Sequence, residues 1–308
     1  MKIGTNCLRT GAALAAIALG LSACTNADVA RILAEGGEDF PEAYVGQVFP
    51  VYFASAEVDG EIGEGSDSMA EAGIGSATFV SPTQIRASIP GQPTRTYTQV
   101  GDTTEYRPDD FDDGGLPLFV VANEFVIVAA NVDVEQFGGG FVAFAGFETP
   151  VENRPNEANY TNGDGVFFVG GEGFGGVNTV TCEDCVSLWA DFINGDISGD
   201  LFMGSFEGGQ GDFDVEVDLV EGEITEEGFT GSLDIAWDLT RFGSEETEEV
   251  ALGLSNQTVI GRFFGPDADV AAVVYETDAD IDLNGEEPGS FAATFSGASG
   301  GERVVNED

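Results

Sequence analysis

Apolar and polar residues alternate along much of this chain, and the alternation predicts short β-strands. Apolar residues recur at every second position in several stretches that Gly, Asn and Asp residues bound, as in half-buried strands. The first of these stretches are residues 44–53, 75–80, 84–89 and 94–100. A helical period of 3.6 residues is hard to find after residue 35. The pattern therefore predicts an all-β protein.

The pattern also divides the chain into two parts. Residues 116–134 form the most apolar stretch after the N-terminus, with room for two strands broken near Asn123 and Glu124. Residues 149–156 contain Pro and Asn and lack an apolar period, which is typical of a linker. We therefore expect a smaller β-rich domain at residues 43–147 and a second domain at residues 148–308.

The N-terminus reads as an export signal. Lys2 and Arg9 precede an apolar run, Gly11 to Leu21, which is too short to span a bilayer. The run ends in Leu21-Ser-Ala-Cys24, which resembles the bacterial lipobox, in which the cysteine is acylated. We therefore predict a lipoprotein signal peptide at residues 1–23, lipid attachment at Cys24 and a tether at residues 24–42. Thr25 favours the outer membrane over the inner; ordinary secretion with a coincidental cysteine is the alternative.

The charge of the chain is strongly one-sided. It has 56 acidic and 10 basic residues and no His, for a net charge of −46. Such a surface repels nucleic acid and anionic lipid headgroups. It suits a saline habitat, and it can also attract cations or a basic partner.

Two cysteines remain after the signal peptide and Cys24 are set aside. They form Cys182-Glu-Asp-Cys185, which in an oxidising compartment predicts a disulfide that pins a tight turn. A redox-active pair, a zinc site completed by acidic residues and two free thiols are the alternatives.

One stretch near the C-terminus has a more specific pattern. Val259 to Phe264 is an apolar and aromatic strand, and Gly265-Pro266 ends it because proline cannot donate to a ladder. Val270 to Tyr275 is apolar again, as a buried strand would be. Two strands that meet at a stiff corner follow from these residues alone.

The corner resembles the signature of the transferrin-binding-protein-B-like β-barrel domain of Gram-negative surface lipoproteins. The matching positions are Gly261, Phe263, Phe264, Gly265, Pro266 and Ala268. Weaker matches are Pro155 with Tyr160, and Asp191-Phe192 with residues 195–201. The resemblance covers about residues 145–308 and implies an eight-stranded antiparallel barrel, with residues 43–147 as the counterpart of the family's handle domain. Residues 158–169 are expected there as two strands around a turn at Asn162-Gly163.

Catalytic chemistry finds little support in the sequence. Without His there is no Ser-His-Asp triad and no His metal site. A partial calcium loop places Asp280, Asp282 and Asn284 at ligand positions, but Phe291 stands where a bidentate Glu is needed. A strand with acidic residues outward is the alternative, and we expect no catalytic residue and no cofactor other than calcium at this place.

The resemblance implies a function in binding. We expect a lipid-anchored outer-membrane surface protein that binds an extracellular ligand or protein, such as an iron or haem carrier, beside an outer-membrane transporter. Two alternatives belong to other classes. One is a structural or adhesive acidic envelope lipoprotein with calcium-binding loops, and the other is a secreted hydrolase with two close carboxylates in a cleft.

Overall fold

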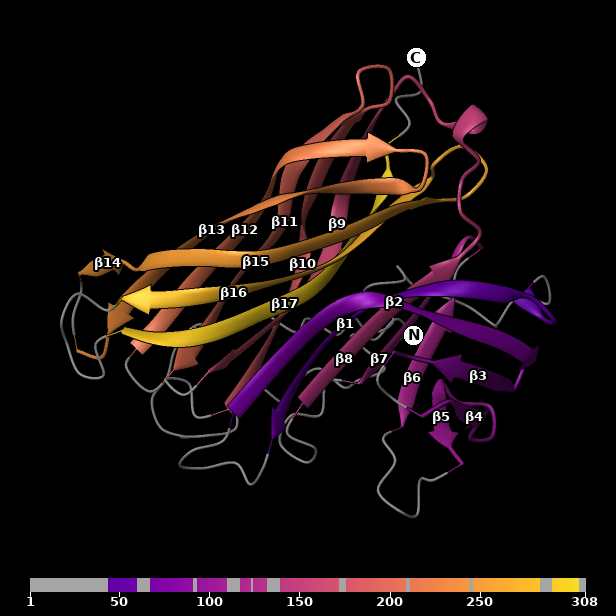
Figure 1. The fold of residues 1–308 in the computed structure, drawn as a ribbon, viewed down its shortest axis with the longest axis horizontal. Coiled ribbons are helices and arrows are strands. Elements are labelled where there is room, and N and C mark those ends of the chain that lie inside the picture. Colours follow the sequence, from indigo (N-terminus) through magenta and orange to yellow (C-terminus); the bar gives the residue numbers. More distant parts are fainter. Residues whose placement is uncertain are drawn as a thin grey trace, which may run out of the picture.

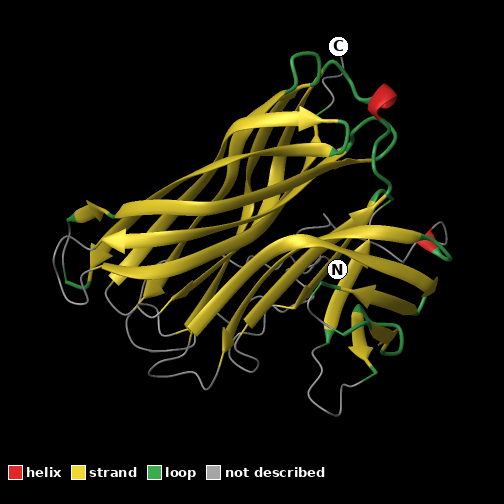
Figure 2. Ribbon diagram, viewed as in Figure 1, coloured by secondary structure: helices red, strands yellow, loops and turns green. Residues whose placement is uncertain are grey.

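The fold consists of two closed antiparallel β-barrels joined by a short linker (Figure 1, Figure 2). The computed structural model describes residues 44–59, 67–90, 93–109, 117–122, 124–131, 139–171, 176–208, 211–243, 246–282 and 290–304. The linker contains one 3-10 turn, η3, at Val151–Asn153. None of the described residues forms a helix long and apolar enough to cross a membrane.

The first barrel is a simple meander of eight strands in sequence order. It closes where β8 pairs with β1, with Phe144 opposite Tyr52. The strands are β1 Val48–Asp59, β2 Asp67–Ser81, β3 Gln84–Ser88, β4 Arg95–Gln99, β5 Glu105–Pro108, β6 Leu118–Ala122, β7 Val126–Asn131 and β8 Gly139–Gly146.

The second barrel repeats this plan with longer strands. Its eight strands are β9 Glu157–Gly171, β10 Gly176–Asp191, β11 Asp196–Gly208, β12 Gly211–Thr225, β13 Gly228–Arg241, β15 Ala251–Phe264, β16 Val270–Asp282 and β17 Ser290–Arg303. The barrel closes where β17 pairs with β9. The short strand β14, Thr247–Glu249, pairs with β13 beside the barrel. The expected eight-stranded antiparallel barrel with a preceding β-rich domain is confirmed.

Aromatic side chains fill the second barrel. Trp237 is almost fully buried, and its ring lies 5.0 Å from Phe295, 5.5 Å from Phe213 and 5.7 Å from Phe206, measured between centroids. In the first barrel an aromatic cluster closes one end. It consists of Tyr44, Phe49, Phe79 and Phe147.

The two barrels share an apolar interface, in which β1 and β2 lie against β16 and β17. Along β16, Ala271 and Val273 point into the second barrel, whereas Val270, Ala272 and Val274 pack toward the first barrel. Because both faces of this strand are buried, its sequence is continuously apolar rather than alternating.

Two hydrogen bonds pair polar groups within this interface. Ser296 Oγ donates a hydrogen bond to the Ser55 carbonyl (3.0 Å), and both residues are buried. The Ala72 N–H donates to Glu276 Oε2 (2.9 Å). Burial raises the pKa of Glu276, and the hydrogen bond from Ala72 opposes that shift. Pairing avoids the cost of buried polar groups without partners, so the interface is suited to a fixed arrangement of the barrels.

Three details differ from the sequence prediction. The residues around Asn162-Gly163 form no turn, because β9 runs through them without a break. Gly163 instead permits a close approach, since a Cβ there would lie 2.4 Å from the Gly300 carbonyl oxygen. The acidic, polar sequence of residues 101–115 predicts a loop, but strand β5 lies within it. The first domain is also itself a closed barrel, which the sequence did not indicate.

Candidate functional site: the linker end of the second barrel

The corner between β15 and β16 is built on two residues with positive φ. Gly265 has φ +90°, and a Cβ there would lie 2.5 Å from Asp269 Oδ2, so only glycine fits. Ala268 has φ +58° although it is not a glycine, and it is fully buried. Arg303 holds the corner from β17, because its Nη1 donates to the Asp267 carbonyl (2.6 Å) and its Nη2 lies 3.3 Å from Asp269 Oδ1.

The linker is tied to this corner by an isolated β-bridge between Glu148 and Phe264. The Thr149 N–H donates to the Phe263 carbonyl (2.8 Å), and Thr149 Oγ1 donates to the Gly265 carbonyl (2.7 Å). The Gly265 N–H in turn donates to the Phe147 carbonyl (2.9 Å). These bonds fix the direction in which the chain leaves the first barrel.

The segments that carry the family resemblance meet at this end of the barrel. Phe263 from the corner packs against Phe192, with centroids 4.8 Å apart, and against Tyr160, at 5.9 Å. The Tyr160 hydroxyl donates to the Ala268 carbonyl (3.1 Å). The matching residues therefore form one structural unit that closes the barrel end.

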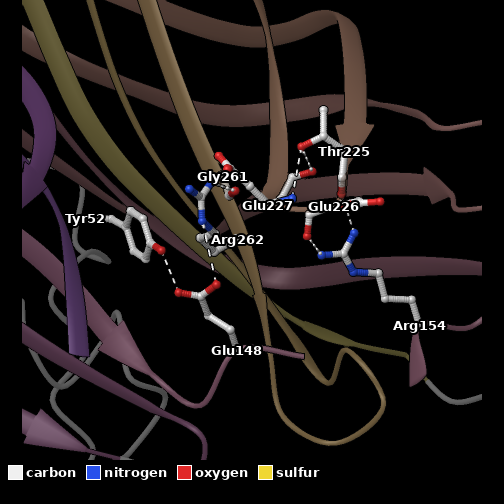
Figure 3. A network of polar contacts seen from close by, with 9 residues as sticks. Tyr52, Glu148, Arg154, Thr225, Glu226, Glu227, Gly261 and Arg262 are labelled. Atoms are coloured by element: carbon white, nitrogen blue, oxygen red, sulfur yellow. Dashed lines mark hydrogen bonds and ion pairs between the residues drawn. The ribbon is translucent and has the colours of Figure 1, made fainter. Parts of the chain in front are cut away.

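Glu148 connects the two barrels through a polar network (Figure 3). The Tyr52 hydroxyl donates to Glu148 Oε1 (2.6 Å), and Arg262 Nε forms an ion pair with Glu148 Oε2 at 3.9 Å. The Arg262 guanidinium carbon also lies 4.4 Å from the centre of the Tyr52 ring, in cation–π geometry. Burial, followed by the hydrogen bond to Glu148, raises the pKa of Tyr52. The hydroxyl is therefore held as the donor.

Arg154, near the end of the linker, ties the linker to the end of β12. Its Nη1 donates to the Thr225 carbonyl (2.5 Å) and its Nη2 to the Glu226 carbonyl (2.8 Å), as Figure 3 shows. Its guanidinium carbon also lies 5.5 Å from the centre of the Phe263 ring. Partial burial lowers the pKa of Arg154. The side chain thus brings a cation to the linker end of a strongly acidic molecule.

A surface depression of about 430 Å³ lies next to Arg154. Its wall combines apolar side chains with the arginine and backbone groups. The lining residues are Val151, Arg154, Pro155, Asn156, Phe192, Ile193, Ile224, Thr225 and Glu226. Two of the apolar side chains are open to solvent, since Val151 is 50% and Ile193 71% exposed.

The turn between β10 and β11 fixes Ile193 in its exposed position. Asp191 Oδ1 accepts hydrogen bonds from the N–H groups of Ile193 and Asn194 (both 3.0 Å), and Asp191 Oδ2 accepts one from Asn194 Nδ2 (2.6 Å). These bonds lower the pKa of Asp191. An isoleucine held toward solvent by a rigid turn exposes apolar surface without a packing benefit for the free protein.

The two later cysteines lie within a strand. A disulfide joins Cys182 and Cys185 in β10, with Cα atoms 5.9 Å apart. The local turn that the disulfide pins is a bulge within β10, because the pairing of β10 with β9 shifts register between Cys182 and Val186. Asp184 adopts φ +55° at this bulge. Cys24, the predicted lipid-attachment residue, lies outside the described residues.

A buried carboxylate supports the bulge. Asp164 on β9 is only 8% exposed, and its Oδ1 accepts the Asp184 N–H at 2.9 Å. Burial raises the pKa of Asp164 to about 7, and the hydrogen bond from Asp184 limits the rise. No sequence signal pointed to this residue, because 56 acidic residues make any single carboxylate inconspicuous.

The calcium candidates are not gathered into a site in the described part of the chain. Asp280 is exposed on β16, Asp282 ends that strand, and Asn284 lies outside the described residues. A row of three aspartates crosses β11, β12 and β13, with Asp218 opposite both Asp200 and Asp234. Burial, with Asp200 next, raises the pKa of Asp218 to about 6. Among the described residues no group of three or more acidic or cysteine side chains is arranged to hold a metal ion.

Sequence reasoning missed the residues that shape the depression and the network. Val151, Arg154 and Ile193 are ordinary loop residues in the sequence, and Tyr52 and Glu148 come from segments 96 residues apart. The scarcity of basic residues was one available signal. In a chain with 10 basic and 56 acidic residues, each arginine is a candidate for a specific structural or binding role.

Comparison with known proteins gave matches among solved structures. No protein-family model matches the sequence, and no curated protein sequence matches it significantly. The chain is similar to a mutant of transferrin-binding protein B from Haemophilus parasuis, with a TM-score of 0.42 and 15% identity, over 83% of this chain and 45% of that one. It is also similar to the isotype 1 protein from serogroup B Neisseria meningitidis, with a TM-score of 0.34, 12% identity and coverages of 82% and 44%. A third similar structure is intact Ap-TbpB with its N and C lobes, with a TM-score of 0.30, 13% identity and coverages of 84% and 78%. The chain thus spans less than half the length of the first two.

Proposed function

We propose that this chain is a lipid-anchored protein of the outer-membrane surface of a Gram-negative bacterium, and that it binds an extracellular protein without catalysing a reaction. One observation carries the binding part of the proposal. Val151 and Ile193 expose apolar side chains around a depression that Arg154 borders. Exposed apolar surface rimmed by polar groups is typical of interaction sites. A rigid turn and a rigid linker hold these side chains in place, so binding would require little ordering.

The depression and the charge of the chain together define the partner's chemistry. An apolar side chain of the partner would fill the depression between Val151 and Ile193. The net charge of −46 favours a partner whose surrounding surface is basic, because complementary potentials speed association and reject acidic proteins. Arg154, whose Nη1 and Nη2 already donate to two backbone carbonyls, would add positive charge at the edge of the depression.

Anchoring and biological role rest on the sequence. The lipobox-like segment before Cys24 supports attachment to the membrane by acyl chains. The corner motif supports kinship with surface lipoproteins that capture iron or haem carriers, beside a transporter in the same membrane. Both parts of the proposal can fail while the depression still binds a protein.

The test is capture followed by direct binding. The chain from Thr25 onward is incubated with spent growth medium, with calcium or with a chelator, and bound proteins are identified by mass spectrometry. A captured protein is then purified and its affinity measured for the parent chain and two variants. We expect Ile193→Ser to weaken binding at least about tenfold, because a central apolar contact often contributes more than 1 kcal/mol.

Ile74→Ser is the matched control. Ile74 is also an exposed isoleucine (45%), but it lies on β2 of the first barrel, so its replacement should leave the affinity unchanged. Equal loss of affinity in the two variants, or in neither, would contradict the depression as the contact surface. If nothing is captured and the melting temperature rises with calcium, the structural envelope role with calcium-binding loops becomes the better account.

A further inference from the structure

The first barrel contains a cavity that is partly open to solvent. It has a volume of about 120 Å³ and is lined by side chains from every strand of the barrel except β5. Most of the lining is apolar, for example Ile85, Val120, Ile127 and Ala143. The aromatic cluster of Tyr44, Phe49, Phe79 and Phe147 closes the barrel on the side where β1 begins and β8 ends.

The polar lining residues lie toward the opposite end of the barrel. Arg95 begins β4 and Asn131 ends β7, and antiparallel order places both away from the aromatic cluster. Asn131 is only 2% exposed, and its Nδ2 donates to the Pro117 carbonyl at 2.7 Å. The cavity thus has an apolar body and one polar end.

The volume decides which molecules fit. Protein cores usually contain few voids larger than a water molecule, so a cavity of this size is unusual. An apolar cavity of about 150 Å³ in another protein stays dry and binds benzene or xenon. Pockets for drug-sized ligands measure about 300–1,000 Å³, so a cavity of about 120 Å³ favours a smaller occupant.

We infer that the first barrel binds a small neutral molecule, the size of one aromatic ring and with a single hydroxyl group, in this cavity. The ring would fill the apolar body, and the hydroxyl would lie against Asn131 and Arg95. A neutral occupant is favoured over an acid because the whole-molecule charge of −46 repels anions before they reach Arg95. This site lies inside the first barrel and is separate from the depression proposed above.

The test is isothermal titration calorimetry of the chain from Thr25 onward with three probes of similar size, p-cresol, toluene and benzoate. We expect p-cresol to bind at one site. Toluene should bind about tenfold more weakly, because it lacks the hydrogen bond at the polar end. Benzoate should bind more weakly than p-cresol.

Substitutions that fill the cavity locate the site. Ala143→Leu and Ala87→Leu each add three carbon atoms to the lining, and both should reduce p-cresol binding at least tenfold. Ala143 is buried and Ala87 only partly buried, so the second variant still tests the cavity if the first does not fold. Ala236→Leu, at an exposed position on β13, is the matched control and should bind as the parent does.

Three results would overturn the inference. No saturable binding of any probe would remove the site. Full binding by both filled variants would place it elsewhere. Tightest binding by benzoate would contradict the assignment of a neutral ligand.

Discussion

Gly261 is the position at which a single methyl group should open the second barrel. It lies opposite Phe229 in the one register pair between β13 and β15. A Cβ at Gly261 would lie 2.1 Å from both Cε2 and Cζ of Phe229. Phe229 is fully buried, and its ring lies 5.1 Å from that of Phe263. Gly261→Ala must therefore move this ring or separate the two strands.

The expected cost follows from these contacts. Overpacking a core costs about 1–3 kcal/mol. If the Phe229 ring also loses part of its burial, up to about 1.5–3 kcal/mol more is lost. We expect a loss of about 3 kcal/mol in the free energy of unfolding. For a domain of this size that corresponds to a melting temperature lower by about 6–12 °C. Differential scanning calorimetry measures the shift.

Gly253→Ala on the same strand is the matched control. A Cβ at Gly253 would meet Asp280 atoms at 3.6 and 3.7 Å, which is ordinary contact. This variant should stay within about 0.5 kcal/mol of the parent. Adding Phe229→Leu to Gly261→Ala should recover part of the loss, with a coupling energy of about 1 kcal/mol or more. If Gly261→Ala and Gly253→Ala have the same melting temperature, the reasoning from the close contact at Gly261 is wrong.

Three further predictions concern other parts of the molecule. Tyr52→Phe removes the hydrogen bond to Glu148 and should lower the free energy of unfolding, measured in urea, by about 1 kcal/mol without changing the m-value. An unchanged urea midpoint would contradict a stabilising role for this hydrogen bond. Asp164 has its pKa raised to about 7 by burial, so the folded protein retains a proton that the unfolded chain loses, and this group lowers stability as pH rises from about 4 to 7. The stability of Asp164→Asn relative to the parent should therefore increase as pH rises across that range, by at most about 4 kcal/mol. If the difference in melting temperature between the two proteins does not change with pH, the raised pKa of Asp164 is refuted. Replacing both Cys182 and Cys185 by Ser should cost about 2 kcal/mol, the value for a short closed loop, and identical denaturation midpoints would show that the disulfide adds no stability.

The fold was largely predictable because period-two patterns and turn residues are local signals. Val259 to Tyr275 has the expected strand, corner and strand, and its Gly-Pro pair stands where the chain turns. Local signals failed where a residue serves a distant neighbour. Gly163 follows Asn162, as in a hairpin turn, yet glycine is needed there because the backbone of Gly300 passes too close for a side chain. Closure of the first barrel depends on β5, which has only four residues and lies between polar stretches of sequence.

The candidate site was less predictable for the same reason. Phe263 and Phe192 were noted through the family resemblance, but the contact of Phe263 with Arg154 depends on how the linker is tied to the corner. The cavity has no sequence signal, because small residues such as Ala87 and Ala143 are common in strands and only the closed barrel shows that they face one space. The sequence therefore predicted the segments that form this end of the barrel, but not the depression beside Arg154 that they create.

The pairing of β17 with β9 also has a consequence for how the protein reaches its folded state. The last strand of the second barrel completes the ladder with the first, so the contact joins segments from opposite ends of the domain. Such long-range pairing slows folding, because chain entropy is lost before the contacts form. Until β17 docks, β9 and β16 each have an unpaired edge that strands of other copies can join. Repulsion between copies that each carry a net charge of −46 opposes this misassembly, so the acidic composition also protects the protein while it folds.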